Sequence, residues 1–440
     1  FRSHVRMLKN QQYPLSKDEK FIDGLYSCVH CGFCLQVCAT YRETGLETES
    51  PRGRIALMKA VNEERITASN IVIEHWDRCV QCRACEIACP SGVPYGMLIE
   101  TTSHSIENTK NEFSLKMLIK SFFLRHIIPQ QKYLKLFISL LYLLQLSKIP
   151  KIIQSIKFFN RLFPTLYNFN QMSPVISPPS MMASGQEFLG KGNRKGRVAL
   201  FTGCLMSLCH GNQMNALVRI LTHNGYTVEL TENQVCCGAI NSHSGDLETS
   251  KNLARKNIDF MLSDSINAII VASAGCGSQL KDYFNLLESD TNYSKKADLF
   301  SKKVKDIHEF LVEIPLKLPT KLLNYNVTYQ DSCHLTHVQK ITDAPRKILS
   351  NIKGLNLIEM TESKMCCGAG GIYSITQPEL SQSILTTKIK NVRATGSNIV
   401  ATANPGCVIQ LQYGVRKHDL NTEVKYVFEL LDQAYHDDYI

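Results

Sequence analysis

The sequence CVHCGFCLQVC, residues 28–38, places four cysteines within eleven positions. Thiols this close together cannot pair as disulfides without strain. Their spacing, C-x2-C-x2-C-x3-C, is the spacing of bacterial ferredoxin-type iron–sulfur ligation. The same spacing returns at 79–89 as CVQCRACEIAC, this time followed by Pro90. The two runs therefore predict a helical, ferredoxin-like domain that binds two [4Fe–4S] clusters.

In two-cluster ferredoxins, the fourth cysteine of each run ligates the other cluster. Each predicted ligand set here takes three cysteines from one run and the last cysteine of the other run: Cys28, Cys31, Cys34 and Cys89 for cluster I, and Cys79, Cys82, Cys85 and Cys38 for cluster II. Structural zinc sites are the alternative, but zinc usually takes two separated C-x2-C pairs. Ala39 stands where the motif has proline, which supplies no ligand.

The other cysteines begin far beyond these runs. Of the 17 cysteines, eight lie between 28 and 89, none between 90 and 203, and nine from 204 onward. Clustering at motif spacing favours metal ligation over scattered core thiols. With 440 residues, the chain has room for two or three domains with cores of their own.

Residues 196–440 contain an internal repeat. Its first copy has RVALFTGCL, VCCGA and AIIVASAGCG, and its second has NVTYQDSCHL, MCCGAGG and NIVATANPGC. Corresponding cysteines are offset by 129, 130 and 131 residues, too regular a spacing for coincidence. Each copy contributes four cysteines: Cys204, Cys236, Cys237 and Cys276 in the first, and Cys333, Cys366, Cys367 and Cys407 in the second.

Within each copy, short β-branched runs such as VALF and AIIVA lead into the cysteines, and helix-like stretches follow. This alternation predicts βαβ units around a parallel sheet. The cysteines would then follow the carboxyl ends of strands, where open α/β sheets place their ligands. We therefore expect the four cysteines of each copy to gather at one edge of their sheet.

The residue types alone do not decide what these repeats bind. A further iron–sulfur cluster, a zinc site and a redox-active cysteine pair all fit four thiols, and thiolate ligands alone do not distinguish iron–sulfur from zinc. Cys209 lies outside the repeat and is expected to be a core thiol. The histidines beside the motifs are expected to be satisfied or exposed side chains rather than ligands: His30, His210, His334 and His337.

The stretch between the ferredoxin-like part and the repeats is apolar, lysine-rich and free of cysteine. Its helical patterning is broken at Pro129, Pro150 and Pro164, and SPVISPPSMMASGQ at 173–186 has the composition of a linker. Its most hydrophobic run, LFISLLYLLQLS at 136–147, has 12 residues and is too short to span a bilayer. The stretch predicts either a surface that lies on an anionic membrane or helices that pack between domains.

Together these patterns predict a multidomain protein of mixed α+β and α/β class. The predicted domains are a ferredoxin-like 2[4Fe–4S] domain at 1–110, a helical basic connector and linker at 111–195, and Cys-Cys-Gly repeats at 196–318 and 319–440. The formal charge of +10 reflects lysine richness, a membrane surface or an acidic partner. No nucleic-acid partner is expected, because no binding module accompanies the charge. The first residues predict no secretory signal.

Two ferredoxin-type motifs followed by two Cys-Cys-Gly repeats resemble the iron–sulfur subunits of bacterial glycolate oxidase, and also those of respiratory glycerol-3-phosphate dehydrogenase and lactate-oxidising systems. The repeats also resemble the cysteine-rich subunit of heterodisulfide reductase, but CGSQ and CVIQ lack the second cysteine of its closing C-x-x-C. The eight cysteines of the two runs match the family's ligands position by position. The likeness to the glycolate oxidase subunit is carried by CVHCGFC at 28–34, PRGRI at 51–55, DRCVQCRACEIACPSGVPY at 77–95 and CCGAGGIYSITQPEL at 366–380.

The resemblance implies the electron-transfer subunit of a flavin-dependent oxidoreductase. A separate FAD-containing subunit would oxidise glycolate to glyoxylate, and this chain would pass electrons toward membrane quinone, as a cytoplasmic protein peripheral on the inner face of the cell membrane. No catalytic residues are expected here, and no G-x-G-x-x-G follows a predicted strand. The equivalent subunit for lactate or glycerol-3-phosphate is one alternative, and a zinc-stabilised scaffold without a redox role is another.

Overall fold

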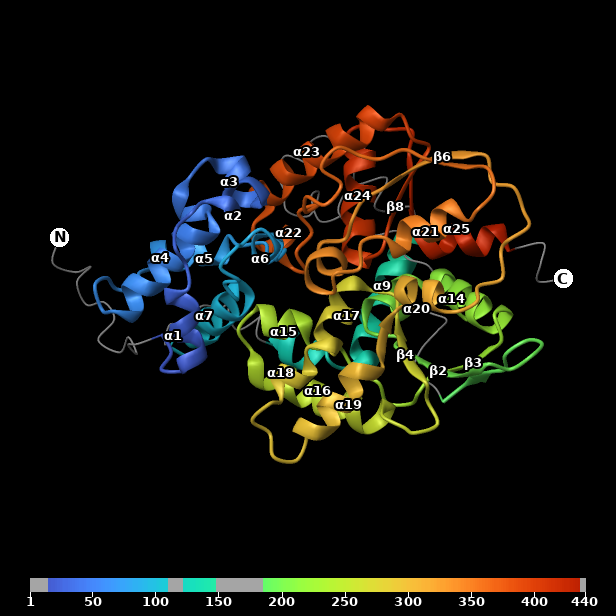
Figure 1. Cartoon of the computed structure of the whole chain (residues 1–440), viewed down its shortest axis with the longest axis horizontal. Coiled ribbons are helices and arrows are strands. Elements are labelled where there is room, and N and C mark those ends of the chain that lie inside the picture. Colours follow the sequence, from blue (N-terminus) through green and yellow to red (C-terminus); the bar gives the residue numbers. More distant parts are fainter. Residues whose placement is uncertain (1–14, 110–121, 148–184, 436–440) are drawn as a thin grey trace. The chain divides into compact units, whose positions relative to one another are not determined.

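The computed structural model describes residues 15–109, 122–147 and 185–435, which form two compact units (Figure 1). Unit 1 consists of the described residues up to 109 together with Ile240–Ser250 and Gly368–Ile384. Unit 2 consists of the described residues of Phe122–Ala239, Lys251–Cys367 and Leu385–Ile440. Each unit has its own hydrophobic core.

Unit 1 is helical up to residue 109. Its core is formed by apolar residues of several helices, among them Phe21, Met58, Trp76 and Leu98. The helices of this part are α1 (Glu19–Tyr26), α2 (Phe33–Val37), α3 (Ala39–Thr44), the 3₁₀-helix η1 (Glu47–Glu49), α4 (Pro51–Asn62), α5 (Asn70–Asp77), α6 (Ala84–Ile87) and α7 (Tyr95–Thr109).

Helix α4 begins at the PRGRI segment, and its local sequence explains this start. The Ser50 hydroxyl accepts a hydrogen bond from the Gly53 N–H, and Pro51 occupies the first helical turn, where its missing N–H costs nothing. Gly53 is needed for close approach, since a Cβ there would lie 1.9 Å from the Glu47 carbonyl oxygen. Helix α4 therefore begins at the first residue of the PRGRI segment.

The two ferredoxin-type runs share one backbone conformation. His30 and Gln81 follow the second residue of their runs with φ of 54° and 53°, and Gly32 and Arg83 follow the second cysteine with φ of 88° and 62°. Left-handed residues alternating with right-handed ones turn successive backbone N–H groups toward one side, as in the anion-binding nests of many iron–sulfur sites. The two runs therefore share their backbone conformation as well as their cysteine spacing.

Unit 2 contains two sheets whose parallel strands follow the same order. The first has the order β1-β3-β2-β4-β5 and the second the order β7-β6-β8-β9. All strand pairs are parallel except β1 with β3, which is antiparallel. The predicted parallel sheets and the internal repeat are thus confirmed, with one antiparallel edge strand added to the first copy.

The first copy follows the alternation of strand and helix that its sequence predicts. Two strands were not predicted, the two-residue β1 and the charged β5, because neither has a β-branched run. The elements are β1 (Glu187–Phe188), β2 (Gly196–Leu200), α13 (Leu205–Cys209), α14 (Gly211–His223), β3 (Tyr226–Glu229), α15 (Ala239–His243), α16 (Leu247–Met261), β4 (Ala268–Val271), α17 (Ala274–Lys281), α18 (Tyr283–Leu286), α19 (Ser294–Lys303), β5 (Val304–Asp306) and α20 (Ile307–Glu313).

The second copy repeats this order, and its last strand, β9, was also not predicted. Its elements are β6 (Tyr325–Tyr329), the π-helix η3 (His334–Val338), α21 (Ala344–Ser350), β7 (Leu355–Leu357), α22 (Tyr373–Thr376), α23 (Pro378–Thr395), β8 (Ile399–Thr402), α24 (Pro405–Lys417), β9 (Glu423–Tyr426) and α25 (Val427–Ala434).

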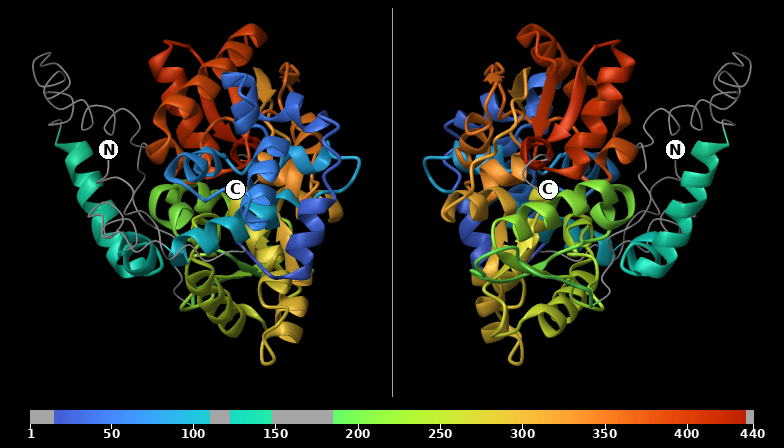
Figure 2. Two further views of the ribbon diagram at one scale, coloured as in Figure 1. Left: turned by 90° about the vertical axis from the view of Figure 1, so that its left-hand side faces the viewer. Right: turned by 90° about the vertical axis from the view of Figure 1, so that its right-hand side faces the viewer.

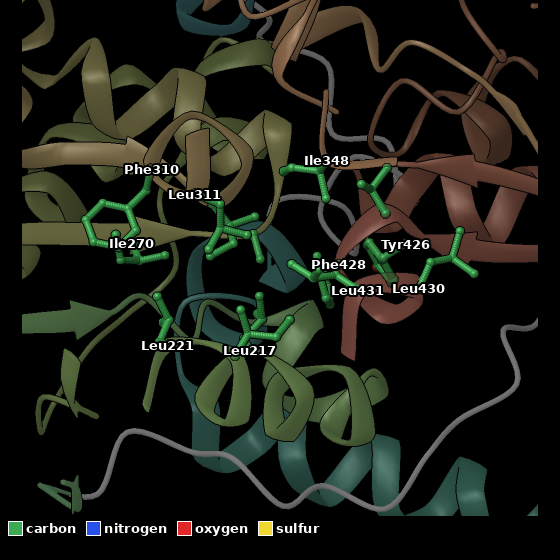
Figure 3. Close-up of a cluster of buried hydrophobic side chains, with 14 of the residues drawn as sticks. Leu217, Leu221, Ile270, Phe310, Leu311, Ile348, Tyr426, Phe428, Leu430 and Leu431 are labelled. Carbon is green, nitrogen blue, oxygen red and sulfur yellow. The ribbon is translucent and has the colours of Figure 1, made fainter. Parts of the chain in front are cut away.

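One hydrophobic core serves both copies (Figure 3). Leu217 and Ile270 of the first copy belong to the same buried cluster as Ile348 and Leu431 of the second. Helix α25 of the second copy packs against α14 of the first. The two copies therefore share one core and form one packed structure rather than two independently packed domains.

The described part of the connector is also helical. It contains the π-helix η2 (Phe123–Ile127) and α9 (Gln131–Leu146), separated by a turn at Pro129. In both views of Figure 2, much of α9 (teal) stands out from the other described elements of unit 2. The predicted breaks at Pro150 and Pro164 and most of the linker lie outside the described residues.

Candidate iron–sulfur centres

The four cysteines predicted for cluster I line one pocket of unit 1. The pocket has a volume of about 420 Å³, part of it open to solvent, and Cys85 also reaches its wall. Cys31 is exposed and the other three are half-buried, so this site lies at the surface of the unit. The predicted set consists of Cys28, Cys31, Cys34 and Cys89.

The set predicted for cluster II is more deeply buried. Cys38, Cys82 and Cys85 are buried, and Cys79 is half-buried. Burial raises the pKa of Cys38 and Cys85, and the neighbouring Cys82 raises both further. Cys79 and Cys38 also raise the pKa of Cys85. The other three thiols of the predicted set therefore lie within electrostatic reach of Cys85.

Hydrogen-bond donors point at these sulfurs. The Cys79 sulfur accepts from the Gln81 N–H at 3.4 Å and from the Tyr95 hydroxyl at 3.5 Å. A backbone N–H from Arg52 toward Cys34 opposes the burial that raises the Cys34 pKa. Thiol-only donor sets, left-handed loops and N–H donors facing sulfur all fit [4Fe–4S] clusters. The ligand assignment itself stays a prediction.

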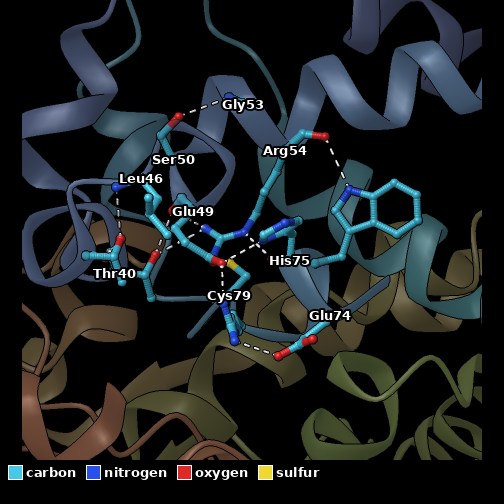
Figure 4. A network of polar contacts seen from close by, with 12 residues as sticks. Thr40, Leu46, Glu49, Ser50, Gly53, Arg54, Glu74, His75 and Cys79 are labelled. Atoms are coloured by element: carbon cyan, nitrogen blue, oxygen red, sulfur yellow. Dashed lines mark hydrogen bonds and ion pairs between the residues drawn. The ribbon is translucent and has the colours of Figure 1, made fainter. Parts of the chain in front are cut away.

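A buried ionic network adjoins the cluster II cysteines (Figure 4). Arg54 and Glu49 are 1% and 0% exposed, and their ion pair measures 2.6 Å. Arg54 also donates to the Thr40 hydroxyl at 3.1 Å, and this hydroxyl lies 3.3 Å from the Cys38 sulfur. Burial lowers the pKa of Arg54, but Tyr95 and thiols including Cys38 outweigh it and raise the pKa. A permanent positive charge therefore lies beside this ligand set.

The thiols of the first repeat lie together in unit 2. The sulfurs of Cys236 and Cys204 are 3.9 Å apart, and a hydrogen bond links Cys237 with Cys276. The backbone of the cysteine pair is held by side chains behind it, since Asn257 donates to the Cys236 carbonyl and the Tyr283 hydroxyl donates to the Cys237 carbonyl. The predicted gathering of this set is thus seen in the structure.

Three thiols of the second repeat also lie together. The sulfurs of Cys367 and Cys407 are 3.3 Å apart, and the nearby Cys366 raises the pKa of Cys407. Asn404 donates to the Cys407 sulfur at 3.8 Å. Cys333 is half-buried, and the Nδ1 atom of the adjacent His334 lies 3.5 Å from its sulfur.

Lys388 is a residue of the second site that the sequence patterns did not indicate. It is 1% exposed, and its Nζ donates to the carbonyls of Glu362 and Ser363 at 2.7 and 3.2 Å. Burial lowers the pKa of Lys388, whereas Cys367 and Cys366 raise it. The equivalent position of the first copy, at the same place in helix α16, is the neutral Asn257. A lysine inside a helix gives no sequence signal for such a role.

The expectations for Cys209 and for the histidines were only partly right. Cys209 is a core thiol, 1% exposed, and burial raises its pKa to about 12. His30 is exposed, as expected. His210 is a correction, because it is buried, its Nε2 lacks a hydrogen-bond partner among the described residues, and burial lowers its pKa to about 4. His337 is also buried, and its Nε2 lies 3.2 Å from the Lys364 carbonyl, whereas its Nδ1 lacks a partner among the described residues.

Two kinds of feature are not found in the described part of the chain. None of its helices has the length and apolar character to cross a membrane. No three of its His, Cys, Asp or Glu side chains converge closely enough to hold a single metal ion.

Known protein families match both halves of the chain. A 4Fe-4S dicluster domain model matches residues 24–93, and a cysteine-rich domain model matches residues 198–281 and again 327–412. The N-terminal part is thus a 4Fe-4S dicluster domain, and the two copies are cysteine-rich domains. The predicted fold class is confirmed.

Individual relatives extend the match over nearly the whole length. The probable glycolate oxidase iron-sulfur subunit of Bacillus subtilis (strain 168) is 38% identical over 418 residues, covering 93% of each chain. The glycolate oxidase iron-sulfur subunit of Escherichia coli (strain K12) is 30% identical, covering 93% of this chain and 94% of its own. Lactate utilization protein A of Shouchella clausii is 29% identical over 53% of this chain. The chain belongs to the family of glycolate oxidase iron–sulfur subunits.

Proposed function

We propose that this chain is the electron-transfer subunit of a flavin-dependent glycolate dehydrogenase. An FAD-containing partner would oxidise glycolate to glyoxylate, and this chain would carry the electrons toward membrane quinone. The observation that supports the proposal most directly is a pair of ferredoxin-type cysteine sets in one compact unit, one at the surface and one buried beside it. A [4Fe–4S] cluster, when bound, takes up and releases one electron at a time.

The electrons balance over the complete reaction. Oxidation of an alcohol to a carbonyl releases two electrons and two protons, which the flavin partner accepts together. This chain would pass the electrons on one by one, and the quinone would take both electrons and two protons to become a quinol. The alcohol carbon therefore reacts on the partner chain, where an organic cofactor can accept a hydride.

The cluster I site has the surface that an electron-exchange partner needs. Cys31 is exposed, and Val29 and Phe33 beside it are 66% and 65% exposed. Both apolar side chains line the same pocket as the cysteines. A partner that covers this apolar rim would exclude water from the site while approaching the ligand sulfurs. We assign this rim to the contact with the flavin subunit.

Helix α9 supports the proposed contact with the membrane surface. One face, with Leu134 and Ile138, packs against α13. The opposite face carries Leu136, Leu140 and Leu143, which are 72%, 58% and 61% exposed. Leucines on the free face of a helix are typical of helices that lie in a membrane interface. The basic positions Lys148, Lys151 and Lys157 lie outside the described residues.

Vesicle sedimentation tests this membrane contact. When mixed with vesicles rich in anionic phospholipid and centrifuged, the wild-type protein should sediment with the vesicles. The double variant L136E/L140E should remain in the supernatant. L318E is the matched control, because Leu318 is 63% exposed elsewhere in unit 2. Equal sedimentation of all three proteins would remove the membrane from the proposal.

Reconstitution tests the electron-transfer role. The chain, its flavin partner and a soluble quinone should together reduce the quinone with glycolate, and omission of this chain should stop the reaction. Lactate and glycerol-3-phosphate serve as competing substrates, since the related subunits of those systems are the alternatives. C31A should lose activity, whereas C209A, which alters only a core thiol, should retain it. Quinone reduction independent of this chain would refute the proposal.

A further inference from the structure

The PRGRI segment directs one arginine toward each ferredoxin-type site. Arg52 lines the cluster I pocket, and its Nη1 donates to the carbonyl of His30 at 2.8 Å. Arg54, two residues later on α4, donates to the Thr40 hydroxyl at 3.1 Å, and this hydroxyl lies 3.3 Å from the Cys38 sulfur. Figure 4 shows Arg54 and Cys79 within one network of contacts. The same type of cation therefore adjoins both sites.

The two arginines differ in how far water screens them. Arg52 is 28% exposed and pairs with Glu47, which is itself 49% exposed. Arg54 is 1% exposed, and its partner Glu49 is 0% exposed. A charge acts over a longer range in a buried, low-dielectric environment than at the surface. Arg54 thus has the larger electrostatic effect on its neighbouring thiolates.

Glu49 does not cancel the positive charge around the cluster II site. Its carboxylate is shared, because one oxygen pairs with Arg54 and the other lies 3.0 Å from Arg78 and 2.7 Å from His75. Two guanidinium groups therefore share one buried carboxylate. The second partner of Arg78, Glu74, is 55% exposed and screened by water. Arg78 is itself 30% exposed, so water screens its charge as well. Arg54 is therefore the buried cation beside this ligand set, and the carboxylate that it pairs with is shared with a second cation.

We propose that Arg54 makes the site of Cys38, Cys79, Cys82 and Cys85 the higher-potential site of the two. The inference rests on the proposed electron-transfer function. Reduction adds one negative charge to a thiolate-ligated cluster, and a nearby buried cation stabilises that added charge. The reduced state is therefore favoured at the buried site over the surface site, and electrons that enter at the surface site move inward.

The test is a potentiometric titration followed by electron paramagnetic resonance. R54Q removes the buried charge, and R52Q makes the same chemical change two residues away at the surface. R54Q should shift the midpoint potential of the buried site downward, and R52Q should shift the surface site much less. R54K keeps the charge and should retain most of the wild-type potential. Signals are assigned with C31S and C82S, each of which alters one ligand set.

E49Q provides a second test of opposite sign with an isosteric side chain. It removes the shared carboxylate and leaves both guanidinium groups, so the buried site should shift upward. This variant also covers the case in which R54Q fails to fold. Iron and sulfide counts on each variant show that both sites are loaded.

Two results would overturn the inference while leaving the electron-transfer role intact. One is a wild-type buried site that reduces at a lower potential than the surface site. The other is a loaded R54Q or E49Q protein whose buried-site potential equals that of the wild type. Failure of the proposed function is a separate outcome, because wild-type protein that contains no iron would show no signal to titrate.

Discussion

Glu100 shows how a single carboxylate fastens a segment of the first repeat to unit 1. Its carboxylate lies 2.8 Å from Arg83 and 2.8 Å from His243, and its side chain is 15% exposed. Gln81 also donates to the His243 carbonyl. Burial raises the pKa of Glu100, but Arg83 and His243 outweigh burial and hold the pKa at about 2. The ionised form is therefore strongly favoured in the folded state.

This pKa makes stability depend on acid pH. The ordinary value of 4.5 lies above the folded value of about 2, so the stabilisation is complete above pH 4.5 and is lost as the pH falls toward 2. E100Q should lower the free energy of unfolding at pH 7 by roughly 3 kcal/mol. Chemical denaturation at a series of pH values checks this, with E107Q on the same helix as the control. A loss that persists unchanged down to pH 3 would contradict the assignment.

A substitution of Lys388 tests whether the second repeat binds metal. A buried lysine is costly unless anions lie nearby, and its nearby anionic groups include Cys366 and Cys367. If those thiols are bound as thiolates, K388M should reduce the metal bound by the second repeat. K390M, an exposed change on the same helix, should leave it unchanged. Metal analysis by mass spectrometry decides, and a K388M protein whose metal content equals that of the wild type would contradict this role of Lys388.

Site residues that belong to a motif of fixed spacing could be predicted from the sequence. Site residues that are recognised only by their neighbours in the fold could not. The cysteine spacing predicted that Cys28, Cys31, Cys34 and Cys89 lie together, and these four line one pocket, while their role as ligands stays a prediction. Arg54 was noticed only as part of the family likeness, and nothing in its sequence surroundings reveals its burial beside Cys38. Glu100 contacts His243, which is 143 residues away in the sequence. Such partners become visible only once the fold brings the segments together.

At the scale of elements, α25 joins the two repeats. Leu431 on this helix is 0% exposed and belongs to the core that both copies share (Figure 3). L431A should cost about 2–5 kcal/mol of unfolding free energy, because the cavity opens within packed structure. Since the core is shared, both repeats should lose stability in one transition. Calorimetry that shows one repeat melting early and the other unaffected would contradict a single core.

Strands were predictable where their residues are buried on both faces. The β4 run AIIV is buried at every position, and its apolar, β-branched residues predicted a strand. The strands β5 (VKD) and β9 (EVKY) lie at sheet edges and carry charges, so their sequences lack this pattern. The antiparallel β1 has only two residues and is defined by its pairing with β3.

For the whole molecule, the sequence predicted the repeat but not how its segments are shared. The offset of about 130 residues between copies became two sheets whose parallel strands follow the same order, with β1 added to the first. Unit 1 nevertheless includes Ile240–Ser250 and Gly368–Ile384, which follow the two cysteine pairs. The Tyr373 hydroxyl donates to the Arg78 carbonyl, and His104 lies 2.7 Å from the Gly245 carbonyl. Contacts between residues so distant in sequence leave no local pattern to recognise.

The domain boundaries placed at 110, 195 and 318 stay a prediction. The contribution of the repeats to unit 1 shows why a cut at such a boundary is a severe change. The two segments lie within the repeats, so a fragment ending near residue 110 would lack part of the unit that holds both ferredoxin-type runs. Experiments on the ferredoxin-type sites are therefore best done on the full chain.

The central claim, an iron–sulfur electron-transfer subunit, is tested most directly by counting iron, sulfide and zinc in anaerobically purified full-length protein. About eight irons and eight sulfides per chain, with a paramagnetic signal after reduction, are expected for the two ferredoxin-type clusters. Clearly more than eight irons would place further clusters in the repeats, and zinc beside eight irons would place zinc there. Protein that contains zinc but no iron would contradict the account.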